Sequence, residues 1–165
     1  MKKRLCKSLS LLLSMVVSIF FIAQPAFAQS NTQTIYSHTE TFEDNSYIVD
    51  EIQVLYPNYS SISPTATTKS KTAVRTYTYY DSLGKKCWSF SLTGTFQYNG
   101  STSKATAASS SYTIYVTGWK CSSKSATYSG NTATGTAAFK YLTRTVNVKI
   151  GLKCSASGSI SNINY

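Results

Sequence analysis

Cys87-Trp-Ser-Phe-Ser-Leu-Thr-Gly-Thr-Phe-Gln-Tyr98 is the stretch with the strongest pattern in this chain. Large apolar residues recur at every second position, and serine, threonine and glutamine lie between them. Because successive side chains of a β-strand point to opposite faces, the alternation predicts a strand with one buried and one solvent-facing side. We expect Trp88 to lie on the buried side with Phe90 and Leu92.

The same two-residue period recurs on both sides of this strand. Asn99-Gly100 predicts a tight hairpin turn because both residues tolerate positive φ, and Asp81-Ser-Leu-Gly84 and Ser129-Gly-Asn131 predict further turns. Additional strands are expected at 47–56, 74–80, 102–108, 112–119, 125–128, 133–142 and 145–154. Short antiparallel strands with turns about every ten residues predict an all-β, two-sheet sandwich, Ig-like or similar, with a small β-barrel as the alternative.

The first residues predict a secretory signal peptide. Met1-Lys-Lys-Arg4 is positively charged, an apolar run extends from Leu9 to Ala23, and small residues precede a cut after Ala28. The run is shorter than the ~20 apolar residues that cross a bilayer. We therefore expect cleavage of residues 1–28, no transmembrane segment afterwards, and a secreted, extracellular protein.

The mature chain is expected to have two parts. Residues 29–70 predict an acidic N-terminal segment that is loosely ordered over 29–45, forms one strand at 47–56 and continues as a linker. Residues 71–165 predict the basic sandwich domain. The acidic segment is either a structural strand of the fold or a propeptide that masks the basic part.

Charge is distributed unevenly along the chain. The formal net charge is +10, and loss of the four cations in the signal peptide leaves 10 − 4 = +6. All six acidic residues precede residue 82. A basic surface without compensating acids attracts polyanions. The candidate binding cations are Lys85, Lys86, Lys120, Lys124, Lys140, Arg144, Lys149 and Lys153, and Lys104 adds to the charge of this half.

Aromatic residues offer a second kind of candidate surface. Tyr77, Tyr79, Tyr115 and Trp119 are the aromatics whose exposure would favour binding of a glycan or a partner protein. They do not interleave with basic residues on a stacking platform, so specific nucleic-acid recognition is not expected.

Catalysis is not expected. The one histidine, His38, lies in the acidic segment without a nucleophile motif around it. The carboxylates that a glycosidase needs are missing from the strand-rich half. No phosphate loop, dinucleotide fingerprint or zinc spacing occurs. We expect no metal and no cofactor.

Three cysteines remain after cleavage: Cys87, Cys121 and Cys154. Outside the cell one pair is expected to oxidise, which leaves one thiol free or available for a covalent dimer. The spacing allows all three pairings. Cys121–Cys154 is favoured because Cys154 continues the apolar face of its strand.

Several stretches of the mature chain together suggest a resemblance: Tyr77-Thr-Tyr-Tyr-Asp-Ser-Leu-Gly84, Trp88 to Gly100, Trp119, Ser125 to Gly135 and Cys154-Ser-Ala-Ser-Gly158. They resemble a group of small secreted proteins of Gram-positive gut bacteria whose function is not known. The resemblance implies a secreted β-domain and no particular activity, ligand or site residue. Members often have a cysteine shortly after the Asn-Gly turn, where this chain has Ala105.

Taken together, these patterns favour a non-enzymatic extracellular domain that binds an anionic envelope or extracellular polymer through its basic surface. One alternative is a cationic antimicrobial or toxin-like protein with an acidic propeptide. A second alternative is a glycan-binding module.

Overall fold

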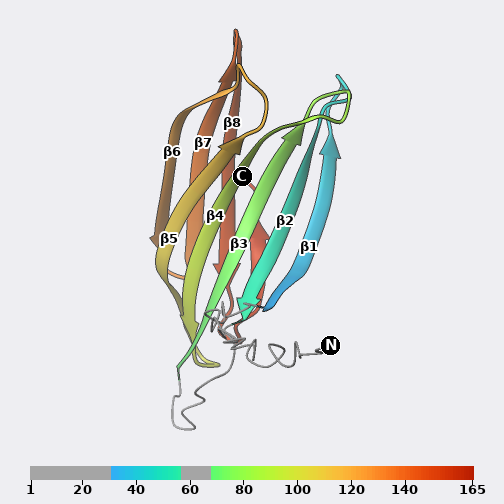
Figure 1. Ribbon diagram of the computed structural model, residues 1–165. Helices are drawn as coiled ribbons and strands as arrows, with labels where there is room; N and C mark the ends of the chain where they lie inside the picture. The colour runs from blue at the N-terminus through green and yellow to red at the C-terminus, as the bar shows by residue number, and fades with distance from the viewer. Residues whose placement is uncertain (1–30, 57–67) are drawn as a thin grey trace, which may run out of the picture.

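The structure is a computed structural model that describes residues 31–56 and 68–165, so the expected signal peptide and most of the expected linker lie outside the described residues. The described chain consists of strands joined by turns (Figure 1). The strands are β1 (Asn31–Thr41), β2 (Tyr47–Tyr56), β3 (Lys69–Tyr80), β4 (Lys86–Tyr98), β5 (Ser103–Ile114), β6 (Lys120–Ser129), β7 (Thr132–Tyr141), β8 (Arg144–Cys154) and β9 (Ile160–Ile163).

The strands form two antiparallel sheets, which confirms the all-β sandwich. Sheet A has the order β1-β2-β3-β4-β5 and sheet B has the order β6-β7-β8-β9. Within each sheet every strand pairs with its sequence neighbours, and the chain passes from sheet A to sheet B between β5 and β6. The connectivity is therefore an up-and-down meander without the Greek-key crossings of Ig domains. The sheets approach each other where β5 leads into β6, and β1 forms the opposite edge (Figure 1). The barrel alternative is therefore wrong.

The core lies between the two sheets and is centred on β4. Trp88, Phe90, Leu92 and Phe96 are fully buried, as the alternation predicts. The Trp88 ring stacks on Phe139 of β7 with ring centroids 4.0 Å apart. Aromatic packing across the interior thus joins sheet A to sheet B at this point.

The acidic segment is built into sheet A. The predicted strand at 47–56 is confirmed by β2, whose Ile48, Ile52 and Val54 enter the core. The expectation of loose order over 29–45 is wrong for residues 31–41, because they form β1 and pair with β2 along their length. A domain boundary at residue 70 would divide sheet A, since β2 also pairs with β3.

The structure also differs from the predicted elements at β5, at β9 and at the Asn99-Gly100 turn. The single strand β5 replaces the two strands expected at 102–108 and 112–119, and β9 was not expected. Of the Asn99-Gly100 pair, Gly100 alone has positive φ, at 91°. The Asn99 side chain instead accepts hydrogen bonds from the backbone nitrogens of Ser101 and Thr102, so the loop is longer than a two-residue turn.

Within residues 31–56 and 68–165, no helix has the length and apolar character needed to span a membrane.

Candidate functional site

Strand β3 places the side chain of one basic residue in the interior of the sandwich. Arg75 is fully buried, in line with Ala73 and Tyr79, whereas Val74 and Thr76 face the outside of sheet A. The pairing register places Arg75 beside Ile52 of β2. Sequence reasoning missed this residue because arginine is rarely buried unless it is paired.

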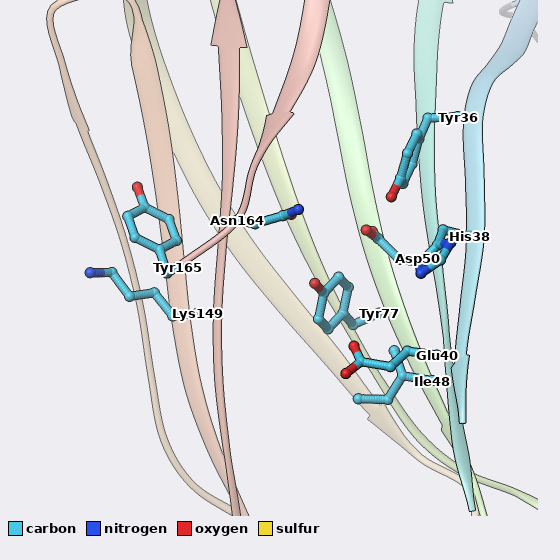
Figure 2. Close-up of a pocket in the computed structure, with 9 residues that line it drawn as sticks. All are labelled: Tyr36, His38, Glu40, Ile48, Asp50, Tyr77, Lys149, Asn164 and Tyr165. Carbon is cyan, nitrogen blue, oxygen red and sulfur yellow. The ribbon is translucent and has the colours of Figure 1, made fainter. Parts of the chain in front are cut away.

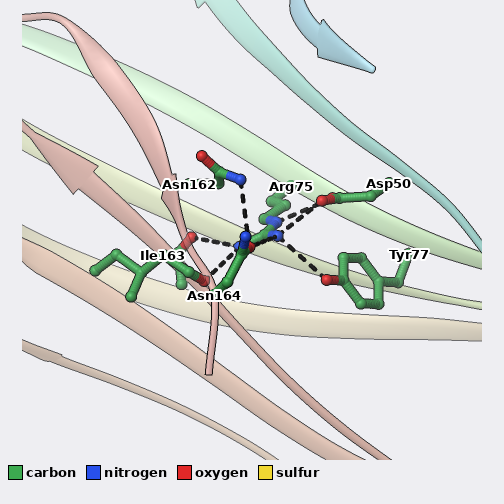
Figure 3. A network of polar contacts seen from close by, with 7 residues as sticks. Asp50, Arg75, Tyr77, Asn162, Ile163 and Asn164 are labelled. Carbon is green, nitrogen blue, oxygen red and sulfur yellow. Dashed lines mark hydrogen bonds and ion pairs between the residues drawn. The ribbon is translucent and has the colours of Figure 1, made fainter. Parts of the chain in front are cut away.

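A polar network surrounds the Arg75 guanidinium (Figure 3). Its Nε and Nη2 donate to the two carboxylate oxygens of Asp50 at 2.9 and 2.7 Å. Nη1 donates to the carbonyl oxygens of Gly151 and Ile163 at 3.0 and 2.7 Å. Sheet A is thereby tied to β8 and β9 of sheet B. Nη2 also donates to the Tyr77 hydroxyl and to Asn164 Oδ1, at 3.2 and 3.1 Å.

These bonds use the whole donor capacity of Arg75. A guanidinium has five N–H groups, and the network gives Arg75 six acceptors. Burial alone lowers the pKa of Arg75, but the hydrogen bond and charge of Asp50 outweigh burial and raise it above its ordinary value. Arg75 is therefore a fixed structural cation without a free donor for a ligand.

A pocket of about 220 Å³ lies beside this network, at the open edge of the sandwich. We call it the edge pocket. Figure 2 shows side chains of β1, β2 and β3 on one side of it and the C-terminal segment on the other. Its lining consists of Tyr36, His38, Glu40, Ile48, Asp50, Tyr77, Lys149, Asn164 and Tyr165.

Several polar groups of the edge pocket have spare hydrogen-bonding capacity. In the part of the chain that the structure describes, the Glu40 carboxylate has no hydrogen bond or ion pair. The Tyr77 hydroxyl accepts from Arg75, which leaves its own hydrogen to donate. Burial raises the pKa of Tyr77, and the Arg75 charge offsets only part of that rise, so this hydroxyl stays protonated. The pocket thus offers acceptors and donors together.

The predicted basic residues do not gather on a single surface. Lys120, Lys140, Lys149 and Lys153 are exposed on the outer side of sheet B, where they alternate with buried residues such as Phe139 and Ile150. We call these four lysines the cationic face. None of them forms an ion pair with a carboxylate among residues 31–56 and 68–165.

The other four predicted cations lie elsewhere. Arg144 bonds Asp44 at 3.1 Å, and Lys124 donates to the Ser110 carbonyl at 3.0 Å across the β5–β6 corner. Lys86 lies over the Tyr115 ring, 4.5 Å from its centroid. Lys85 belongs to the turn between β3 and β4. The expectation of one eight-residue basic surface is therefore too broad.

The predicted aromatic surface is also divided. Tyr79 and Trp119 are 2% and 8% exposed and pack edge to face in the core, so they are wrong as surface candidates. Tyr77 lines the edge pocket. Tyr115 is exposed, and its hydrogen bond with Ser89 lowers its pKa.

The expected Cys121–Cys154 disulfide is wrong. All three described cysteines are free thiols. Cys121 lies beside Phe139 at one end of β7, whereas Cys154 follows Lys153, which pairs with Thr132 at the other end. The two cysteines are therefore about 25 Å apart along the strands, far beyond the roughly 7 Å that a disulfide allows between Cα atoms. Burial raises the pKa of each thiol.

Within the described residues, His38 has no nucleophile beside it in the edge pocket. His38 lies in β1 with its ring 6.5 Å from that of Tyr36, and no serine or cysteine is among the lining residues of the edge pocket. No group of three His, Cys, Asp or Glu side chains within residues 31–56 and 68–165 is arranged to hold a metal ion.

No protein-family model, curated protein or solved structure matches this chain.

Proposed function

We propose that this protein is a secreted, non-enzymatic binding domain that holds an anionic envelope or extracellular polymer on its cationic face. The observation that carries the proposal is the separation of charge between the sheets. Strands β6 to β9 contain no aspartate or glutamate, while the six acids lie in sheet A or its turns. The outer side of sheet B therefore has an uncompensated positive field.

The arrangement of the four lysines favours a polymer over a small anion. Lys120 and Lys140 are directly opposite each other on β6 and β7. Like charges in such cross-strand pairs are unfavourable unless a counter-charge relieves them. Lys153 lies near the other end of the face, ~25 Å away along the strands at about 3.3 Å per residue. Only an extended polyanion spans both ends.

The surface between the lysines suits such a ligand. Threonines of β7, including Thr132, Thr134 and Thr136, share the outer side with Asn147 of β8. Their hydroxyl and amide groups donate hydrogen bonds to phosphate or carboxylate oxygens without adding charge. Lys149 lies between the two ends and is 3.9 Å from the Tyr165 ring centroid.

The antimicrobial alternative has less support. A chain released near residue 65 would lose β2, hence Ile48, Ile52 and Val54 from the core. It would also lose Asp50, the partner of buried Arg75. These contacts favour a structural role for the acidic segment in sheet A over a role as a removable propeptide.

The test uses two polyanions, polyphosphate and polygalacturonate, each immobilised on a column and eluted with salt. We expect the purified protein to be retained and to elute with salt, because salt screens exposed charges. The double variant Lys120→Gln/Lys153→Gln should bind about 30-fold more weakly, at about 1 kcal/mol per lysine. The matched control, Lys69→Gln/Lys104→Gln, removes two exposed lysines of sheet A.

The control separates the cationic face from net charge. Equal losses for the two double variants would contradict the proposal, because they would assign binding to total charge alone. Failure of the unmodified protein to bind either polymer at low salt would contradict it as well.

A further inference from the structure

We propose that the edge pocket binds one neutral sugar ring of a glycan. The inference does not depend on polyanion binding by the cationic face, although Lys149 borders both sites. It rests on the charges, hydrogen-bonding groups and aromatic rings that the fold places around the pocket.

Charges of both signs exclude a strongly charged ligand. Glu40 and Asp50 line the pocket on the side of sheet A, which disfavours an anion. The cation beside them, Arg75, has no donor left. On the opposite side Lys149 disfavours a cation, although its side chain extends away from Glu40 (Figure 2). A neutral ligand is repelled neither by the carboxylates nor by Lys149.

The free groups match the hydroxyls of a sugar. Each sugar hydroxyl donates one hydrogen bond and accepts others. Glu40 accepts, and Asp50 retains lone pairs beyond its two bonds from Arg75. The Tyr77 hydroxyl donates, and so does the Asn164 amide nitrogen, which has no bond to any residue of the described chain.

The rings supply the apolar part of the site. Tyr36 and Tyr77 are half-buried, on β1 and β3. The register places Tyr36 in line with Ile52 and Tyr77 in line with Asp50, two residues along β2, so the tyrosines are diagonal to each other across β2. Amphipathic tyrosine rings pack against apolar surface while their hydroxyls stay hydrated, as the C–H face of a sugar ring requires. The pocket measures about 220 Å³. That is below the roughly 300 Å³ at which pockets for drug-sized ligands begin, so it has room for one ring.

The experiment is an NMR titration of the isotopically labelled, purified protein with methyl glycosides of glucose, galactose, mannose and N-acetylglucosamine. We expect at least one of them to cause saturable shifts of the backbone amides near Tyr36, Glu40, Tyr77 and Asn164. A ligand of this size should bind with a dissociation constant of ~1 mM.

Two variants and one control define the site. Glu40→Gln and Tyr77→Phe should each weaken binding of that glycoside several-fold while the spectrum stays that of the folded protein. Thr39→Ala is the matched control, because Thr39 neighbours Glu40 on β1 and points to the opposite face. It should bind like the unmodified protein.

Three results would overturn the inference. One is the absence of saturable shifts with all four glycosides at tenfold above the expected dissociation constant. Another is equal binding by Glu40→Gln and the Thr39→Ala control. The third is a response of the same amides to methylammonium or to inorganic phosphate but to no glycoside, which would assign the pocket to an ion. None of these outcomes depends on Lys120 or Lys153, so the inference can fail while the cationic face still binds polyanions.

Discussion

Asp50 is the counter-charge of a guanidinium that has no access to solvent, and its neutralisation is expected to destabilise the fold strongly. Asp50→Asn leaves the Arg75 charge buried and unpaired. Removing one partner of a buried ion pair costs about 3–5 kcal/mol. Urea denaturation followed by circular dichroism should therefore show a lower free energy of unfolding by roughly that amount.

The neighbouring residue provides the control for Asp50. Glu51→Gln removes the same charge from the next position of β2, where the side chain faces away from the core and has no ion pair in the described residues. Its effect should be within about 0.5 kcal/mol. Similar losses in the two variants would mean that the Arg75 network does not hold the sheets together.

Ionisation of the Tyr77 hydroxyl should make the free energy of unfolding depend on pH in the alkaline range. Burial raises its pKa in the folded state. A raised pKa contributes stability that is fully present below the unfolded value, about pH 10 for tyrosine, and is lost as pH rises through the folded value. Tyr77→Phe has no hydroxyl to ionise and lacks this contribution.

The measurement compares unfolding free energies of the two proteins as pH increases. The advantage of the unmodified protein over Tyr77→Phe should stay constant between about pH 8 and pH 10 and shrink above that. An advantage that grew above pH 10 would show that the folded pKa of Tyr77 is lowered.

The turn between β7 and β8 contains a residue that does not suit its backbone conformation. Leu142 has a φ of 52° and is 88% exposed. Tyr141 pairs with Arg144, so Leu142 is the first of two turn residues, and the second has no positive φ. Glycine is favoured at this position of a type II′ turn.

Leu142→Gly should therefore stabilise the protein. A residue with a Cβ atom in a left-handed conformation costs about 1–2 kcal/mol, and replacement by glycine removes this cost. The larger conformational entropy that glycine loses on folding offsets about 0.5–1 kcal/mol of the gain. Leu83→Gly is the matched control, because Leu83 is 91% exposed in the β3–β4 turn without positive φ. It should lower stability, and a lower melting temperature for both variants would contradict the turn assignment.

The sequence predicts elements well where one face of a strand is buried and poorly elsewhere. The alternation in β4 and β2 gives those strands within one residue at either end. In β1 every residue except Tyr36 is exposed, so no hydrophobic period exists, and pairing with β2 makes it a strand. In β5 the run Ser109-Ser-Ser111 resembles a loop but continues the ladder with β4.

The edge pocket could not be predicted for a related reason. Arg75 is placed in the core by Asp50, which lies 25 positions earlier, and by carbonyl groups near the C-terminus. Local patterns contain no signal for such contacts. The period of two in β3 places Tyr77 and Tyr79 on the face opposite Val74, but it does not indicate which of the two faces is buried. Three lysines of the cationic face, Lys140, Lys149 and Lys153, were predictable because the alternation in β7 and β8 places them outward. Lys120 begins β6, where most residues are exposed and the sequence has no comparable alternation.

Residues 31–56 supply two of the five strands of sheet A. A chain that begins at Thr65 would expose the edge of β3 and remove Asp50 from Arg75. We expect this fragment to lack cooperative unfolding and dispersed NMR resonances. A chain that begins at Glu43 keeps β2 and its core residues, so it should fold with reduced stability.

These two truncations also separate the proposed functions. The chain from Glu43 lacks Tyr36, His38 and Glu40, so it should lose glycoside binding at the edge pocket while it retains polyanion binding through sheet B. The chain from Thr65 should bind neither the glycoside nor the polyanion, because its two sheets no longer pack against each other. If that fragment instead folded and inhibited bacterial growth, the acidic segment would be a removable propeptide, and the antimicrobial function would replace the binding function proposed for this protein.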